Sequence, residues 1–183
     1  FLYLLLLDNN FMMKIFGPKS LSSFLFYAIF FGTVFFTLLM LYIVLSFTLG
    51  NYEVLDGRFT IPFPLFSYFD IKGDYKTSII ISITLSLIYI VTFLYSLSRI
   101  FKSFMSGVIF NTMVIRHLKI LAFINLMVFP ILYILIRSVI LNISIMGGIH
   151  NMILSLLFGV FSLLIAAIFK RGVQVQNEND LTI

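Results

Sequence analysis

Four long apolar stretches, separated by polar or charged connectors, dominate this chain of 183 residues. A helix rises about 1.5 Å per residue, so roughly 20 apolar residues cross the ~30 Å hydrocarbon core of a bilayer. Each stretch is long enough, and none contains Asp or Glu. We expect an all-α membrane protein with four transmembrane helices, at about residues 21–49, 77–98, 118–141 and 151–169.

The composition excludes a soluble fold for most of the chain. Hydrophobic residues make up 61% of it and charged residues 10%, against about 25% charged in an average soluble domain. The bilayer must therefore act as solvent for much of the surface. The net charge of +5 is divided among connectors rather than gathered on one soluble face, so direct nucleic-acid binding is not expected.

The basic residues predict the orientation, because lysine and arginine are enriched in cytoplasmic loops. The connector after the first span carries Arg58, Lys72 and Lys76, and four acidic residues offset them. The opposite side carries a larger basic set, namely Lys14, Lys19, Arg99, Lys102, Arg116, Lys119, Lys170 and Arg171. We therefore expect a multi-pass protein with both termini in the cytoplasm.

The spans divide the chain into an N-terminal segment (1–20), a four-helix transmembrane domain (21–171) and a cytoplasmic C-terminal tail (172–183). Residues 1–11 precede the first methionine, Met12. We interpret them as upstream read-through or the remnant of a cut precursor, and assign them no function.

The connector between the first two spans contains Asp56-Gly57, a strong signal for a two-residue hairpin turn. We expect a small extracytoplasmic β-hairpin at about residues 52–61, ended by Pro62. Two strands alone are marginal in water, so the hairpin should lean on the bundle or the membrane surface. Its acids could bind a cation or a partner, although a solvated connector is the simpler role.

The connector between the second and third spans lies on the basic side. Gly107 breaks its helical pattern, and Asn111 is a good N-cap for a helix starting at Thr112. The first turns of that helix carry Arg116, His117 and Lys119. Anionic lipid would account for these charges, and docking of a protein is the alternative.

Two polar residues, Asn125 and Arg137, lie inside the third span, and such residues are functional candidates by default. We expect Asn125 to hydrogen-bond to a neighbouring helix. Arg137 lies near the outer end and can extend to the headgroups. Pro130, between them, should kink the helix. The spans offer no buried acid, which argues against a self-sufficient ion-coupled pump.

Small residues recur at helical spacing in three spans, a pattern that lets helix backbones approach closely in lipid. We expect them to pack the four helices together, with a homodimer face as the alternative. These residues are Ala28, Gly32, Ser78, Ser82, Ser86, Ser155, Gly159, Ser162 and Ala166.

The residues offer little for catalysis. Cysteine is absent, which excludes thiolate metal sites and a cysteine nucleophile. His117 and His150 belong to opposite sides of the membrane, too far apart to share a metal ion. No hydrolase triad, phosphate-binding glycine loop or HExxH motif occurs. We expect no enzymatic activity, no catalytic or metal site and no cofactor.

The tail alternates as a strand would over residues 173–176, and residues 177–180 are typical of a turn. Leu181, Thr182 and Ile183 then form an apolar tip. This tip could fold back on the inner connector or pair with a strand of a partner.

Two segments resemble a known family. The ending IFKRGVQVQNENDLTI combines an apolar span, a basic clamp, a glycine and an END-LT-hydrophobic finish. The segment GVIFNTMVIRHLKILAFINL has a Phe-x-x-Asn-like and Leu-Lys pattern, although Val-Ile-Phe-Asn stands where Pro-Phe and a polar pair are usual. Over residues 20–183 the chain resembles the bacterial membrane proteins of "domain of unknown function 2975".

The resemblance implies a four-helix protein of the bacterial cytoplasmic membrane with no established activity. It also implies a partner, because such proteins are often encoded beside a small helix-turn-helix regulator. We hypothesise a regulator or sensor that docks a cytoplasmic protein through the inner connector and the tail. Alternatives are an accessory subunit of a larger membrane complex, a homo-oligomer, or a small oligomeric channel or transporter. The expected docking residues are Arg116, His117, Lys119, Asn179, Asp180, Leu181, Thr182 and Ile183.

Overall fold

The computed structural model describes residues 15–63, 70–106 and 109–180. This part of the chain is mostly helical. It contains four helices that are long and apolar enough to cross a membrane, as expected from the apolar stretches. They are α2 (Leu21–Leu49), α3 (Thr77–Phe104), a third helix over Thr112–Ile140, and α6 (Ile149–Asp180).

The apolar surface of these helices is mostly open. In α2, only 11% of the most apolar window is buried inside the chain. Side chains such as Phe24 and Phe31 are more than 60% exposed. Lipid must cover this surface, because water would make its exposure too costly.

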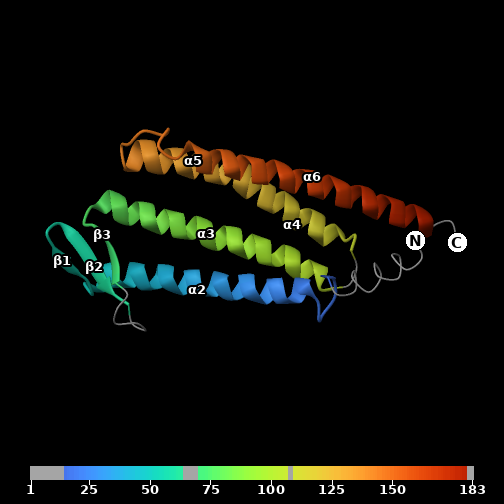
Figure 1. Cartoon of the computed structure of the whole chain (residues 1–183), viewed down its shortest axis with the longest axis horizontal. Coiled ribbons are helices and arrows are strands. Elements are labelled where there is room, and N and C mark those ends of the chain that lie inside the picture. Colours follow the sequence, from blue (N-terminus) through green and yellow to red (C-terminus); the bar gives the residue numbers. More distant parts are fainter. Residues whose placement is uncertain (1–14, 64–69, 107–108, 181–183) are drawn as a thin grey trace.

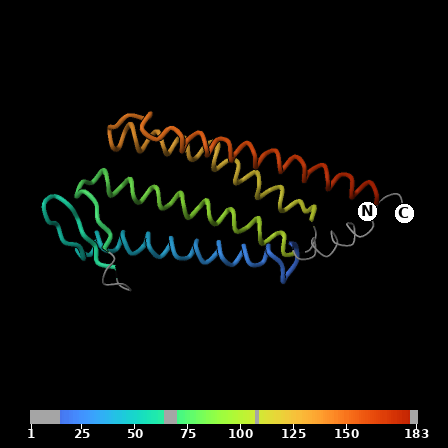
Figure 2. The backbone as a smooth tube through the Cα atoms, viewed as in Figure 1, coloured from blue at the N-terminus to red at the C-terminus, as the bar shows by residue number. Residues whose placement is uncertain are grey.

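The third helix is composite. It consists of α4 (Thr112–Phe123), the π-helical segment η1 (Ile124–Val128), α5 (Phe129–Ile134) and a second π-helical segment, η2 (Leu135–Ile140). At η1 the Phe129 N–H donates to the carbonyl of Ile124, five residues back. Pro130 follows directly, so this widened turn accommodates a residue that cannot donate to the helix. Figure 2 shows the helix changing direction between α4 and α5.

The connector between α2 and α3 forms a three-stranded antiparallel sheet of β1 (Glu53–Leu55), β2 (Arg58–Pro62) and β3 (Asp70–Asp74). Asp56 and Gly57 join β1 to β2 with φ angles of 51° and 73°, as a tight primed turn requires. The sequence predicts the hairpin of the first two strands at about residues 52–61, but not β3, which carries a single apolar residue, Ile71.

The sheet packs on one end of the α2–α3 pair. Phe59 and Ile61 of β2 are fully buried, in one cluster with Ile43 and Leu87 of the helices. The Phe59 and Phe47 rings meet edge to face, with centroids 5.0 Å apart. This burial supplies the support that an isolated hairpin lacks.

The helices are arranged as two layers, α2 beside α3 and the composite helix beside α6 (Figure 1). The layers meet between α3 and α4, where buried Ile100, Val114, Leu118, Leu121 and Ala166 form a core. We call the end that carries the strands the sheet end. The opposite end, where α2 and α4 begin and α3 and α6 stop, is the basic end (Figure 1).

The end of the chain corrects one expectation. Residues 173–180 continue α6 as a helix, so the predicted strand and turn are wrong. A period of two over four residues is too short to outweigh a helix that is already nucleated, since each further residue adds a hydrogen bond at little cost. Gln and Glu in this segment are also good helix formers.

Candidate functional site

The C-terminal part of α6 is long enough to extend beyond a membrane. With 32 residues, the helix measures about 48 Å, roughly 18 Å more than the hydrocarbon core. Its charged residues begin with Lys170 and Arg171 and continue to Asp180. We call residues 170–180 the α6 extension, and expect it to lie outside the hydrocarbon at the basic end.

The Phe110 side chain, in the connector between α3 and α4, contacts this extension. Asn111 caps α4, as the sequence predicted, because its Oδ1 accepts a hydrogen bond from the Met113 N–H at 2.8 Å. The Phe110 ring contacts Phe169 edge to face, with centroids 5.6 Å apart.

Gly172 makes room for Phe110 on α6. A Cβ atom at residue 172 would collide with the Phe110 ring, so only glycine allows this approach. A glycine inside a helix lowers its stability by about 1 kcal/mol relative to alanine. Here the glycine lets the Phe110 ring pack directly on the backbone of α6. The sequence predicted neither residue as part of the site, although both stand in the segments that resemble the family. An apolar residue before an N-cap and a mid-helix glycine were the available signals.

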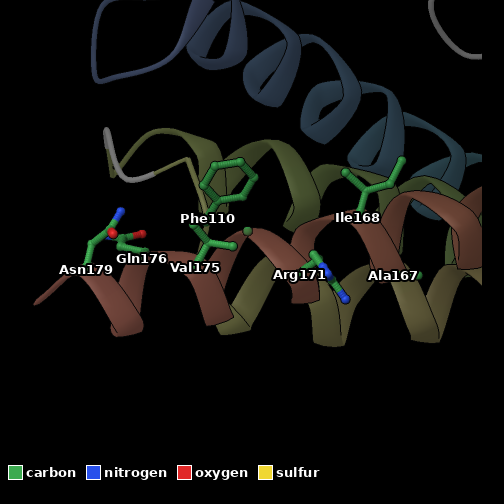
Figure 3. Close-up of a pocket in the computed structure, with 8 residues that line it drawn as sticks. Phe110, Ala167, Ile168, Arg171, Val175, Gln176 and Asn179 are labelled. Atoms are coloured by element: carbon green, nitrogen blue, oxygen red, sulfur yellow. The ribbon is translucent and has the colours of Figure 1, made fainter. Parts of the chain in front are cut away.

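Phe110 and the α6 extension border a shallow groove of about 840 Å³. In Figure 3 the side chains of α6 stand in a row along the helix, with Phe110 above Val175. The surface is apolar around Phe110 and Val175 and polar toward the helix end. The full lining is Phe110, Ala167, Ile168, Arg171, Gly172, Val175, Gln176 and Asn179.

The structure places the predicted docking residues unevenly. Asn179 lines the groove. Arg116 and Lys119 are exposed on α4 and His117 is half-buried, and none of the three borders the groove. The Asp180 side chain and residues 181–183 lie outside the described part of the chain.

The basic end carries most of the positive charge. Among the described residues it holds seven lysine and arginine side chains and one acid, Glu178, whereas the sheet end holds four, Arg137 included, together with four acids. The groove therefore opens in a positive field. The seven residues are Lys19, Arg99, Lys102, Arg116, Lys119, Lys170 and Arg171.

Asn125 forms the polar centre of the bundle and is 2% exposed. The Ser155 hydroxyl of α6 donates to the Asn125 carbonyl oxygen at 3.0 Å and to its Oδ1 at 3.1 Å. The Tyr89 hydroxyl of α3 also donates to Oδ1, at 3.3 Å, and Asn125 Nδ2 donates to the Leu121 carbonyl at 2.8 Å. Asn125 therefore links three helices, as a buried amide in a membrane should.

The small residues of α6 face the composite helix. Ser155, Gly159, Ser162 and Ala166 are all buried. A Cβ on Gly159 would stand 2.6 Å from Leu126 Cγ, so the two backbones approach closely there. This stripe packs the bundle within one chain.

The other small residues are placed differently. On α3, Ser82 is buried, Ser78 is half-buried, and Ser86 is exposed. On α2, Ala28 is exposed, and a Cβ on Gly32 would meet nothing within 4 Å. Ala28 and Gly32 therefore make no close helix contact in the described part of the chain.

Arg137 is half-buried at the sheet end of the composite helix. Its Nε donates to the Ser144 carbonyl at 2.9 Å, and its guanidinium lies 5.8 Å from the centroid of the Tyr133 ring. It therefore holds the turn between the composite helix and α6. Among the described residues, no three His, Cys, Asp or Glu side chains gather where they could hold a metal ion.

Comparison with known proteins gives one match. Residues 63–183 match the model of a family described as a protein of unknown function, DUF2975. The matched region contains β3 and all helices from α3 to α6, and leaves out α2. Neither a curated protein nor a solved structure matches the chain.

Proposed function

The chain belongs to the DUF2975 family, and we propose that it is a non-enzymatic integral membrane protein that docks a soluble cytoplasmic protein at its basic end, as a regulator or sensor. The main support for this proposal is the close contact between the Phe110 ring and the backbone of Gly172. This contact joins the connector and the α6 extension, the two segments on which the docking hypothesis depends, beside one groove.

The proposal places the basic end in the cytoplasm. Support comes from the seven basic side chains at that end, since cytoplasmic loops are rich in lysine and arginine. Both termini then face the cytoplasm of a bacterial cell, and the sheet lies on the outer side. The α6 extension is long enough to clear the hydrocarbon and meet a soluble partner.

The groove suits a particular kind of partner. Its apolar lining residues, which include Ile168, Val175 and Phe110, can contact the apolar face of an amphipathic helix. Arg171 at the border favours acidic residues beside that face. A small helix-turn-helix regulator, which the family resemblance suggests, is the candidate to test first. The groove is assigned to binding, and no catalytic step is assigned to it.

A second candidate function is that of a subunit in a larger membrane assembly. The exposed face of α2 favours it, because Ala28 and the open Gly32 are spaced for close approach by another helix. That helix could belong to another protein or to a second copy of this chain. The two functions use different faces of the molecule, so variants can separate them.

Affinity purification from native membranes in mild detergent tests the proposal. A soluble protein that is recovered with the intact chain should be lost when residues 172–183 are deleted. It should persist when Gly32 is replaced by leucine. Membrane proteins recovered in fixed ratio, and lost only with Gly32→Leu, would favour the subunit function instead.

A further inference from the structure

A second cavity, of about 710 Å³, lies between α3, the composite helix and α6. It extends from the level of Asn125 and Phe158 to the level of Arg137 and Asn151 at the sheet end. The docking proposal does not use this cavity, and the inference drawn from it does not rest on that proposal.

The deep end of the cavity is aromatic, and its polar groups are already paired. Tyr89 and Phe129 lie with ring centroids 4.8 Å apart, and Phe93 and Phe158 with centroids 5.8 Å apart. The Tyr89 and Ser155 hydroxyls both donate to Asn125. This end therefore offers an apolar surface and little hydrogen bonding for a polar solute.

The mouth of the cavity carries a positive charge. Arg137 lines it and uses its Nε for the Ser144 carbonyl. The sheet holds the ion pairs Arg58–Asp74 and Lys72–Asp70, and Arg137 takes part in neither. The Arg137 charge therefore has no carboxylate in the described part of the chain, although a charge in a membrane helix gains from an anionic partner. Asn151 lines the same mouth and adds an amide.

The distance between the two ends matches one leaflet of a bilayer. Asn125 and Arg137 are 12 positions apart, which corresponds to about 18 Å along a helix. Half of the hydrocarbon core is about 15 Å. A cation at the membrane edge and an apolar channel of this length together fit a molecule with an anionic head and an acyl chain.

We propose that this cavity binds an anionic phospholipid from the leaflet at the sheet end. The phosphate pairs with Arg137 at the mouth. One acyl chain lies along the composite helix and ends against the rings of Tyr89 and Phe158. Arginine is suited to bidentate pairing with phosphate. Little side-chain entropy is lost on pairing, because contacts with Tyr133 and Ser144 already hold the Arg137 guanidinium in place.

Photo-crosslinking tests this site in the full chain. The protein is reconstituted in phosphatidylcholine vesicles with a trace of phosphatidylglycerol that carries a diazirine in one acyl chain, and labelled peptides are identified by mass spectrometry. We expect labels on the cavity residues Leu132, Leu154 and Phe158. Unlabelled phosphatidylglycerol should compete, and phosphatidylcholine with the same diazirine should label these peptides far less.

Two variants identify the head and the chain. Arg137→Gln should lower cavity labelling about tenfold, the loss expected for one charged hydrogen-bonding partner. Arg58→Gln, an exposed arginine on β2, is the matched control and should change nothing. Ser86 is an exposed residue that lines the cavity. Ser86→Trp should exclude the acyl chain and so lower the labelling of the cavity residues, while Arg137 remains in place.

Equal labelling by the two lipids in the intact protein would overturn the proposal without any variant. Labels confined to residues outside the cavity, such as Leu157 and Leu164, would overturn it as well. A palmitate probe with the same diazirine distinguishes a free fatty acid as the source, because labelling by palmitate alone would contradict a phospholipid ligand.

Discussion

The ring of Phe110 lies so close to the backbone of Gly172 that no Cβ atom fits between them. This approach is a contact between the connector before α4 and the α6 extension. It also forms one wall of the groove that we propose as the docking surface. A small change at residue 172 should therefore alter the basic end and leave the rest of the bundle intact.

The contact itself can be tested with a disulfide, because the chain contains no cysteine. Phe110→Cys combined with Gly172→Cys should form an intramolecular disulfide under mild oxidation, since the connector places the two positions side by side. Mass spectrometry of the digested protein detects the linked peptides. The pair Phe110→Cys and Gly32→Cys is the control, and efficient linkage in the control would contradict the arrangement described here.

The absence of cysteine also allows the orientation in the membrane to be tested with single introduced cysteines. We expect a cysteine replacing Asp56, in the turn between β1 and β2, to react with a membrane-impermeant maleimide on intact cells. A cysteine replacing Gln176, on the α6 extension, should react only after the cells are permeabilised. The opposite pattern would place the basic end outside the cell and remove the basis for a cytoplasmic partner.

The Asn125 centre should contribute measurably to stability. Ser155→Ala removes the donor to both Asn125 oxygens. We expect the free energy of unfolding to fall by about 1 kcal/mol, within the range of roughly 0.6 to 1.7 kcal/mol for such bonds in membrane bundles. Thermal unfolding in detergent measures the loss. Thr92→Ala is the matched control, because the Thr92 hydroxyl bonds only to the Ile88 carbonyl of its own helix. Equal effects of the two changes would show that the bond between helices adds nothing.

The sheet should depend on Gly73. A Cβ at this residue of β3 would stand 2.8 Å from Phe59 Cε1, and Phe59 is fully buried against the helices. Gly73→Ala should therefore force the ring to move, at a cost of about 1–3 kcal/mol typical of overpacking. Faster proteolysis between α2 and α3 would reveal it. Gly32→Ala adds the same methyl group in open space and should have no such effect.

The helical layout was readable from the sequence because long apolar runs without acids have few alternatives in lipid. The first span matches α2 from Leu21 to Leu49, and the Asn111 cap was predicted from local chemistry alone. The α6 extension was misread because four alternating residues carry too little information to outweigh a long adjoining helix. β3 pairs with β2, from which it is separated in the chain by residues 63–69. A local sequence pattern does not predict pairing between such separated segments.

The candidate site was only partly predictable. Both segments were identified, but the residues that join them, Phe110 and Gly172, meet only through the packing of α4 on α6. Arg116 and Lys119 were predicted as docking residues because of their charge, yet they do not border the groove. Charge can be read in a sequence, whereas the shape of a surface depends on the tertiary fold.

One measurement tests the docking claim most directly. Gly172→Leu places an isobutyl group where Phe110 sits and distorts the groove, while Gly32→Leu adds the same group to an open face of α2. Both variants are purified with their partners from native membranes in mild detergent and compared by quantitative mass spectrometry. Our account predicts that a soluble partner recovered with the intact chain falls at least about tenfold with Gly172→Leu, the effect of losing roughly 1.4 kcal/mol of binding, and is unchanged with Gly32→Leu. Recovery of the same soluble proteins in the same amounts with both variants would contradict it.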